Sequence, residues 1–231
     1  MLDLARIRAI TLDLDDTLWP IWPVIQRAEN ALTHWLSDHA PMTSALFANP
    51  HARHDIREHV IKTHPHLVHD LKAIRLEAIR LALYRAGENP LLAVPAFEVF
   101  FAERQRVVFY DDALPALVWL AQRYPLVSLS NGNAELERVG LAGHFKAAVS
   151  AAQCGFGKPD VRIFQIAADV AGVRPDEVLH VGDDASTDVL GALGAGMQTV
   201  WVNRTEEMWP YDHVHPHDTV SQLNELCDLL S

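Results

Sequence analysis

The sequence has few cysteines, no excess of basic charge and no long apolar run, and each shortage excludes a class of protein. Its two cysteines, Cys154 and Cys227, are too few for a disulfide framework, so we expect a reducing, cytoplasmic location. Lysine and arginine total 19 against 30 aspartates and glutamates, and the formal net charge of −11 argues against a nucleic-acid partner. No apolar stretch approaches the roughly 20 residues of a membrane-spanning helix, so we expect no membrane partner. Acidic residues also occur too early in the chain for a signal peptide.

What the sequence does contain is the pattern of an α/β protein. Hydrophobic residues make up 49% of the 231 residues and charged residues 21%, which is typical of a globular protein with one large or two small domains. Apolar, β-branched segments predict strands at 7–14, 126–129, 147–151, 178–181 and 199–202. Helical patterns occupy 114–123, 133–139, 160–171 and 187–195. Strands that alternate with helices indicate a Rossmann-like, doubly wound parallel sheet.

The stretch from residue 19 to residue 112 shows no β alternation. We therefore predict an all-α cap domain at 19–112, inserted into an α/β core formed by 1–18 and 113–231. The clearest helical pattern there covers residues 67–84 and carries apolar stripes on two nearly opposite sides. Two such stripes predict a helix in the middle of a small bundle.

Polar residues follow four of the predicted strands. Asp13 ends the first, Ser130 the second and Asp183 the fourth, whereas Lys158 lies in the loop after the third. Taken alone, each is a common cap, turn or solvated residue. Ligands of open α/β sheets bind outside the carboxyl ends of the strands, so the joint placement predicts one convergent site.

The residue types at these strand ends suit phosphoryl transfer. Asp13 can act as a carboxylate nucleophile that forms an aspartyl-phosphate, which divides one difficult displacement into two steps. Asp15, two residues further on, can protonate the leaving oxygen and then take a proton from water.

The remaining groups can bind a cation and a phosphate. Asp183, with Asp184 and Asp188 nearby, offers the hard oxygen ligands that suit Mg²⁺. The Ser130 hydroxyl and the following amides can hold phosphoryl oxygens, and the residues concerned are Ser130, Asn131 and Gly132. Lys158 can neutralise carboxylate and phosphate charge. Because the chain is acidic, the site needs such local positive charge to bind a phosphate.

These segments resemble the four motifs of the haloacid dehalogenase (HAD) superfamily. They are Asp13-Leu14-Asp15-Asp16-Thr17, Ser130-Asn131-Gly132, Lys158-Pro159, and Gly182-Asp183-Asp184 followed by Asp188. The resemblance implies a HAD core with a helical cap inserted after the first motif. True dehalogenases of the superfamily lack an aspartate at the position of Asp15, so the resemblance implies a phosphatase.

The same resemblance assigns roles to individual residues. It implies a nucleophilic Asp13, acid–base catalysis by Asp15, and phosphate binding by Ser130 and Lys158. It further implies Mg²⁺ bound by Asp13, Asp183 and the backbone carbonyl of Asp15. Two further carboxylates, Asp184 and Asp188, are then expected beside the metal ligands rather than among them.

Other segments are similar to the bacterial flavin mononucleotide (FMN) phosphatases of this superfamily. They are His180-Val181-Gly182-Asp183-Asp184, Thr187-Asp188-Val189, Gly196-Met197-Gln198, and His69-Asp70 followed by Arg75. That group also acts on the phosphorylated pyrimidine intermediate of riboflavin metabolism. The resemblance therefore implies FMN or a riboflavin-pathway phosphate as the substrate.

Aromatic and basic residues of the predicted cap are candidates for substrate choice. Trp19 and Trp22 follow the first motif closely, where their rings can stack on a planar substrate or instead pack at the cap hinge. Arg75 has an apolar border on the helical wheel and can meet a polar substrate or extend to solvent. Lys72 is a weaker candidate for the same reason.

Two alternatives to a small-molecule phosphatase remain open at this stage. A sugar phosphomutase uses the same motifs but returns the phosphoryl group to a sugar instead of to water. A receiver-like signalling domain also surrounds Mg²⁺ with an acidic pair, a Ser or Thr and a Lys. Receivers, however, are about half this length, lack a helical cap and need no acid at Asp15. No pattern in the sequence specifies an oligomeric state.

Overall fold

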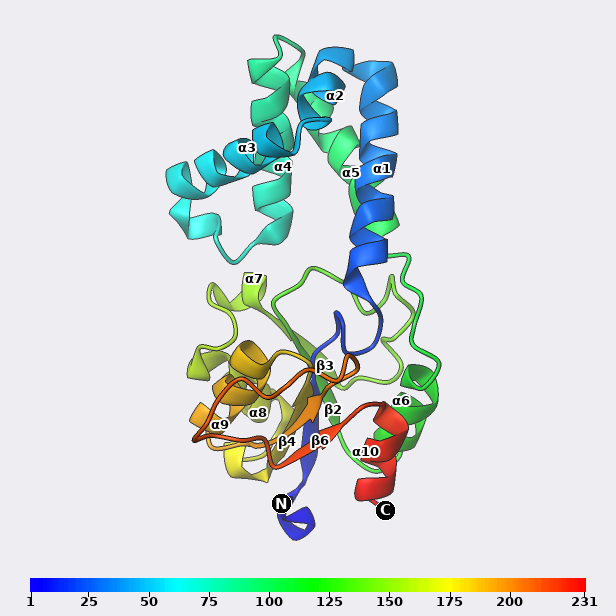
Figure 1. The fold of residues 1–231 in the computed structure, drawn as a ribbon, viewed down its shortest axis with the longest axis vertical. Coiled ribbons are helices and arrows are strands. Elements are labelled where there is room, and N and C mark those ends of the chain that lie inside the picture. Colours follow the sequence, from blue (N-terminus) through cyan, green and yellow to red (C-terminus); the bar gives the residue numbers. More distant parts are fainter. The chain divides into compact units, whose positions relative to one another are not determined.

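The computed structural model describes residues 1–231, which form two compact units (Figure 1). We call them the core unit and the helical unit. The core unit comprises Met1–Pro20, Val108–Gly132 and Leu136–Ser231. The helical unit comprises Ile21–Val107 and Asn133–Glu135. None of the helices combines the length and the apolar character needed to cross a bilayer.

The core unit is built on a six-stranded, all-parallel sheet in the order β3-β2-β1-β4-β5-β6. The strands are β1 (Ala9–Leu12), β2 (Leu126–Ser130), β3 (Ala147–Ser150), β4 (Val178–Gly182), β5 (Gln198–Val202) and β6 (Asp218–Val220). Residues of β1, β2, β4 and β5 are buried throughout, as expected of strands covered on both faces. This architecture confirms the predicted doubly wound α/β class.

Helices cover both faces of this sheet. They are α6 (Ala113–Ala121), α7 (Ala151–Cys154), α8 (Val161–Ala171), α9 (Gly191–Gly194) and α10 (Leu223–Leu229), with short 3₁₀ turns at Leu4–Arg6 and Pro175–Glu177. In Figure 1, α8 and α9 lie on one side of the sheet and α6 and α10 on the other. The α8 helix, which the sequence predicted over 160–171, begins after Asp160, whose carboxylate accepts from the Arg162 amide, and ends before left-handed Gly172.

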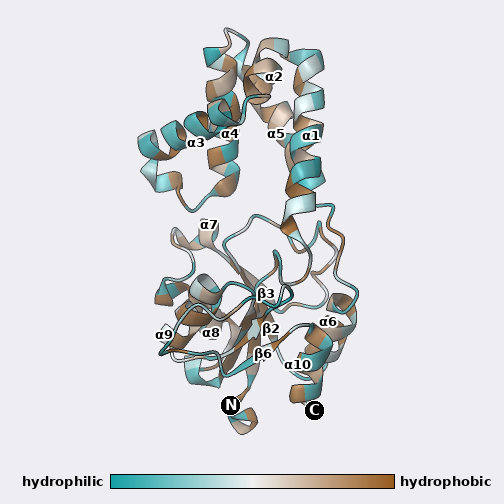
Figure 2. Cartoon of the chain, viewed as in Figure 1, coloured by the Kyte–Doolittle hydropathy of each residue, from teal (hydrophilic) through white to brown (hydrophobic).

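The helical unit contains α1 (Ile21–His39), α2 (Pro41–Phe47), α3 (Pro50–Thr63), α4 (Leu71–Arg85) and α5 (Ala93–Arg104), with 3₁₀ turns at Pro65–Leu67 and Pro90–Leu92. Prolines begin α2, α3 and both turns. Proline is tolerated there because an N–H at the first helical position forms no hydrogen bond within the helix. Teal and brown segments alternate along these helices in Figure 2. Their apolar faces form one core, to which α1 contributes Ala28, Leu32 and Leu36 at four-residue spacing.

Three helices differ from the sequence prediction. Residues 133–139 form turns instead of a helix, because the Gln105 side chain donates to the Asn133 carbonyl and accepts from the Glu135 amide. The predicted helix over 67–84 begins only at Leu71, where the Asp70 carboxylate accepts from the Ala73 amide. The predicted helix over 187–195 is a π-helical turn, Ala185–Leu190, followed by α9.

Candidate active site

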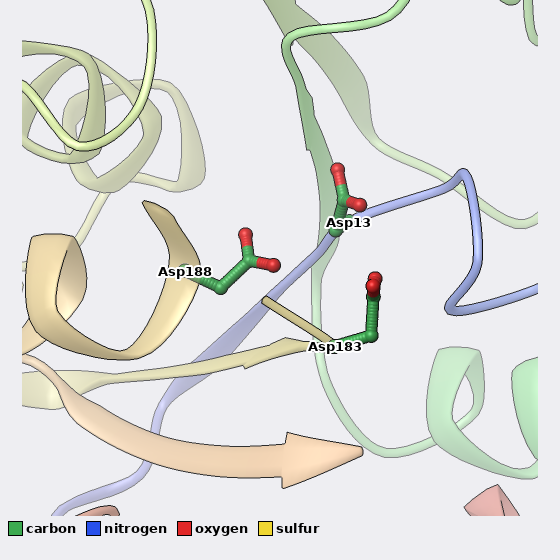
Figure 3. Close-up of side chains that lie close together, drawn as sticks. All are labelled: Asp13, Asp183 and Asp188. Atoms are coloured by element: carbon green, nitrogen blue, oxygen red, sulfur yellow. The ribbon is translucent and has the colours of Figure 1, made fainter. Parts of the chain in front are cut away.

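Three carboxylates converge at the carboxyl ends of neighbouring strands (Figure 3). Asp13 follows β1 directly, Asp183 follows β4, and Asp188 belongs to the π-helical turn after β4. One oxygen of each carboxylate lies within 4.8 Å of one oxygen of each of the others. Parallel pairing of β1 with β4 continues to Asp13, whose amide donates to the Val181 carbonyl at 2.9 Å. The sheet thus assembles residues that are 170 positions apart in the sequence.

Lys158 is the cation that the protein supplies to this cluster. Its side chain is buried, and Nζ donates to Oδ1 of Asp13 at 2.6 Å and to Oδ1 of Asp188. Burial alone would lower the pKa of Lys158, but the carboxylates of Asp13 and Asp188 raise it above its usual value. Lys158 is therefore a fixed positive charge against Asp13.

One ammonium group does not balance three carboxylates. Burial, reinforced by the charges of Asp188 and Asp183, raises the pKa of Asp13 well above its usual value despite the opposing effect of Lys158. Burial and the charge of Asp188 raise the pKa of Asp183 to about 7. Uncompensated hard oxygen donors of this kind fit a divalent cation, whose charge would take the place of the bound protons.

The loop after β1 orients Asp15. Its Oδ1 accepts a hydrogen bond of 2.9 Å from Nε1 of Trp19. Trp19 is fully buried at 0% exposure and packs edge-on against Phe109, with ring centroids 5.6 Å apart. Its ring is therefore not available to stack on a substrate, and it serves the site by holding the Asp15 carboxylate. Asp16, between Asp15 and Trp19 in the sequence, has a left-handed φ of 58°. This backbone conformation is costly for a residue other than glycine and is concentrated at functional sites.

The loops after β2 and α7 are tied together beside Asp13. The Asn131 side chain donates to the Lys158 carbonyl at 2.9 Å and accepts from the Lys158 amide at 2.8 Å. Gly157 allows this approach, because a Cβ there would lie 2.4 Å from Asn131 Oδ1. The buried Ser130 hydroxyl accepts from the Gly132 amide at 2.9 Å. Asn131 thus positions Lys158 through its side chain, a role that the sequence analysis did not foresee.

The two carboxylates expected beside the metal ligands have different surroundings. Asp184 is exposed, and its Oδ1 accepts from the Ser186 and Thr187 amides at the start of the π-helical turn. Asp188 is buried, and its Oδ2 accepts from the Asp184 amide at 3.0 Å. A Cβ at Gly182 would lie 2.4 Å from Cγ of Asp188, so glycine is required there for Asp188 to keep its place.

The structure places the remaining candidates, Trp22 and Arg75, in the helical unit. Trp22 lies near the start of α1 with 76% of its surface exposed. Arg75 on α4 forms an ion pair with Glu29, and its guanidinium lies 4.1 Å from the ring centroid of Phe100. Lys72 likewise pairs with Glu135. Trp22 is thus an open aromatic face, whereas the charge of Arg75 already has a partner.

Three further side chains form hydrogen bonds to Asp183 and Asp188 that the sequence did not predict, although Thr17 and His180 belong to the quoted motif segments. Thr17 Oγ1 donates to Asp183 Oδ1 at 2.8 Å, and Trp201 Nε1 on β5 donates to the Asp183 carbonyl at 2.6 Å. His180 Nε2 lies 3.1 Å from Asp188 Oδ1. His180 is a polar residue in an otherwise apolar strand and belongs to one of the segments similar to the FMN phosphatases, but neither signal predicts its contact with Asp188.

Comparison with known proteins identifies relatives that span the whole chain. A family model described as haloacid dehalogenase-like hydrolase matches residues 7–196, a range that includes all four motifs. The 5-amino-6-(5-phospho-D-ribitylamino)uracil phosphatase YigB of Escherichia coli K12 is 34% identical over 234 residues, and the match covers 98% of each chain. Phosphoserine phosphatase of Thermus thermophilus is 40% identical over 136 residues, covering 56% of this chain and 55% of that protein.

A solved structure is similar over nearly the same length. It is described as a 2-haloacid dehalogenase from Pseudomonas syringae pv. Tomato DC3000, and it superposes with a TM-score of 0.92 at 36% identity. The match covers 97% of this chain and 98% of that chain. The relatives therefore include proteins described as phosphatases and a protein described as a dehalogenase.

Proposed function

The chain belongs to the haloacid dehalogenase-like hydrolase family, and on this premise we propose that it is a Mg²⁺-dependent phosphatase acting on a small phosphomonoester through an aspartyl-phosphate on Asp13. Family membership confirms the superfamily and the hydrolase class that the four motifs predicted. The observation that carries the proposal is the buried pair of Asp13 and Lys158 beside the carboxylate of Asp183. A carboxylate suited to be the nucleophile, a fixed cation and a further carboxylate suited to bind a metal meet there.

In the first step of the proposed reaction, a carboxylate oxygen of Asp13 attacks phosphorus and the ester P–O bond breaks. Asp15 gives a proton to the departing alkoxide, which leaves as the alcohol. In the second step Asp15 takes a proton from water, whose oxygen attacks phosphorus. The bond between phosphorus and Asp13 breaks, which restores the carboxylate and releases inorganic phosphate.

The residues suited to hold Mg²⁺ are Asp13, Asp183 and the backbone carbonyl of Asp15. Asp188 is less suited, because its Oδ1 already accepts from Lys158 and its Oδ2 from the Asp184 amide. When bound, the ion supplies positive charge to the phosphoryl oxygens. Lys158 adds charge from the protein, and the Ser130 hydroxyl together with the amides of Asn131 and Gly132 supplies neutral donors.

For the substrate we propose FMN or a phosphate of the riboflavin pathway. The full-length similarity to the Escherichia coli phosphatase of a ribitylaminouracil phosphate supports this class. Trp22 is the preferred contact for the ring of such a substrate, since its indole is exposed. Arg75 is the weaker of the two contacts proposed from the sequence, because it would have to release Glu29 to bind a substrate.

A dehalogenase is the second candidate, since the similar Pseudomonas syringae structure is described as one. Displacement of a halide ion requires no proton, whereas an alkoxide leaving group does. Asp15 follows the proposed nucleophile by two residues and accepts a hydrogen bond from Trp19, and it is suited to supply that proton. This favours phosphate esters. The receiver-like alternative does not fit a hydrolase family member with a separate helical unit.

The test is a panel assay of the purified protein with Mg²⁺, with Asp13→Asn as the inactive control. Phosphate release is measured from FMN, the ribitylaminouracil phosphate, phosphoserine and hexose phosphates, and halide release from 2-haloacids. We expect phosphate release, highest with the first two compounds. Halide release without phosphate release would establish the dehalogenase instead, and isomerised hexose phosphate would establish the phosphomutase.

A further inference from the structure

A series of buried hydrogen bonds connects side chains of β1 and β4 to Asp13, the proposed nucleophile. It joins, in order, Thr11, His180, Asp188, Lys158 and Asp13. We propose that Thr11 and His180 are positioning residues. The Thr11 hydroxyl selects the tautomer of His180 that donates to Asp188. Asp188, held in this way, keeps Lys158 against Asp13. The inference rests on the proposed function, because it assigns Thr11 and His180 a part in setting the rate of phosphoryl transfer.

The first link is fixed by strand register. Thr11 on β1 and His180 on β4 are directly paired residues of adjacent parallel strands. Their side chains meet, with Thr11 Oγ1 2.8 Å from Nδ1 of His180. Thr11 is 0% exposed and His180 1%, so water does not compete for either group. Thr11 also precedes Asp13 by two residues, and residues at this spacing point to the same face of a strand.

The direction of each hydrogen bond follows from the partners. The Lys158 ammonium lies against Asp188 Oδ1 and favours the ionised carboxylate, which has no proton to donate, so Nε2 of His180 must be the donor to Asp188. Burial lowers the pKa of His180, in agreement with a neutral ring. A neutral imidazole that donates from Nε2 accepts at Nδ1, and the Thr11 hydroxyl must then donate.

Loss of this donation would release Asp188. Oδ1 of Asp188 accepts from His180 and Lys158, and Oδ2 accepts from the Asp184 amide. Each of these donors restricts rotation of the carboxylate. The ring of His180 is itself held edge-on by Phe164, with centroids 5.1 Å apart. Without the Thr11 hydroxyl the ring can place its proton on Nδ1, and Nε2 would then present a lone pair to Asp188. Lys158 would lose the fixed acceptor that aims it at Asp13.

The kinetic test compares Thr11→Val with Thr11→Ser, using a small aryl phosphate and Mg²⁺. Valine keeps the shape of threonine but removes the donor, and serine keeps the donor. We expect kcat to fall about tenfold for Thr11→Val with KM nearly unchanged, and to recover for Thr11→Ser. Thr199→Val is the matched control, because Thr199 is equally buried in β5 of the same sheet but contacts His217. An equal loss of kcat in Thr199→Val, or none in Thr11→Val, would overturn the proposal.

A second readout does not depend on activity. Nitrogen-15 NMR of the histidine rings, with the His180 signal assigned by its absence in His180→Gln, reports which ring nitrogen carries the proton. We expect the Nε2–H tautomer in the wild-type protein and a loss or mixture of that tautomer in Thr11→Val. A wild-type ring protonated at Nδ1 or at both nitrogens would overturn the proposal even if phosphate is released. Failure of the proposed function would instead appear as a wild-type protein without phosphatase activity and with the expected tautomer.

Discussion

At the residue scale, the two carboxylates that follow β1 differ in surroundings, and this difference supports the two roles proposed for them. Asp13, the nucleophile of the proposed reaction, is buried, and one of its oxygens accepts a hydrogen bond from Lys158. Asp15 is partly exposed and has a neutral donor, Trp19, as a partner. A group that must exchange protons with a leaving group and with water needs such access.

The acid role of Asp15 predicts a dependence on the leaving group. Asp15→Asn should slow an alkyl phosphate at least tenfold more than an aryl phosphate, because a phenolate leaves with little need of a proton. The check is kcat/KM for both esters in the variant and the wild type. Equal losses for the two esters would argue against proton donation by Asp15.

The contact between Trp19 and Asp15 predicts a smaller effect of the same kind. Trp19→Phe keeps an aromatic ring in the core but removes the Nε1 donor, so kcat for the alkyl ester should fall roughly threefold to tenfold, the effect of one hydrogen bond. Trp119→Phe on α6 is the matched control, since Trp119 contacts Arg123 at the surface. Identical kinetics for Trp19→Phe and the wild type would mean that Asp15 is oriented by other groups.

At the scale of elements, one arginine joins three loops of the core unit. Arg204, after β5, donates to the Thr17 carbonyl and forms a two-pronged ion pair with Asp112, which precedes α6. Its guanidinium also lies 3.9 Å from the ring centroid of Tyr110. Burial alone would raise the pKa of Asp112, but the hydrogen bonds from Arg204 and the Leu223 amide lower it. The pair is therefore a structural connection between the loop that carries Asp15 and the rest of the unit.

Removal of this arginine should be costly. Arg204→Met leaves the Asp112 carboxylate largely buried without its main partner, and we expect the free energy of unfolding to fall by about 2–4 kcal/mol. Chemical denaturation of both single variants and of Arg204→Met with Asp112→Asn measures the coupling. The double variant should lose less stability than the sum of the single losses, whereas simple additivity would show that the pair contributes no coupling.

Strand positions and motif residues could be read from the sequence, because apolar runs and strand ends are local signals. The three-residue strand β6 carries no such signal, and its extended backbone pairs with the edge of β5. The helix expected at 133–139 fails because Gln105, distant in sequence, binds its first backbone groups. Thr11 and His180 meet through strand register, which no local pattern reveals.

At the scale of the whole molecule, a protein of net charge −11 concentrates three carboxylates in one partly buried cluster. In the metal-free protein, burial and the charge of Asp188 give Asp183 a pKa of about 7. A cation can bind this carboxylate only after the proton leaves, so metal binding and proton release are linked. Below about pH 7 the proton therefore competes with the metal.

This linkage predicts that the apparent affinity for Mg²⁺ weakens by about tenfold for each pH unit below the pKa of Asp183 through the proton of that carboxyl alone, and more steeply where Asp13, whose pKa is also raised, must release a second proton. Titration calorimetry in buffers of different ionisation enthalpy measures both the affinity and the protons released. Asp183→Asn should abolish binding, while Asp184→Asn, at an exposed carboxylate whose capping role asparagine can fill, should not. Affinity independent of pH between about 5 and 7 would contradict the linkage.

The central claim is that the phosphoryl group passes through Asp13, and the most direct measurement is to trap it there. Turnover of an aryl phosphate with Mg²⁺ is quenched in acid within milliseconds, and the peptide that contains Asp13 is analysed by mass spectrometry. The account predicts one added phosphoryl group on Asp13 during turnover, decaying as substrate is consumed, and none in Asp13→Asn. Undiminished turnover by Asp13→Asn, or a phosphoryl group on another residue of the active wild-type protein, would contradict it.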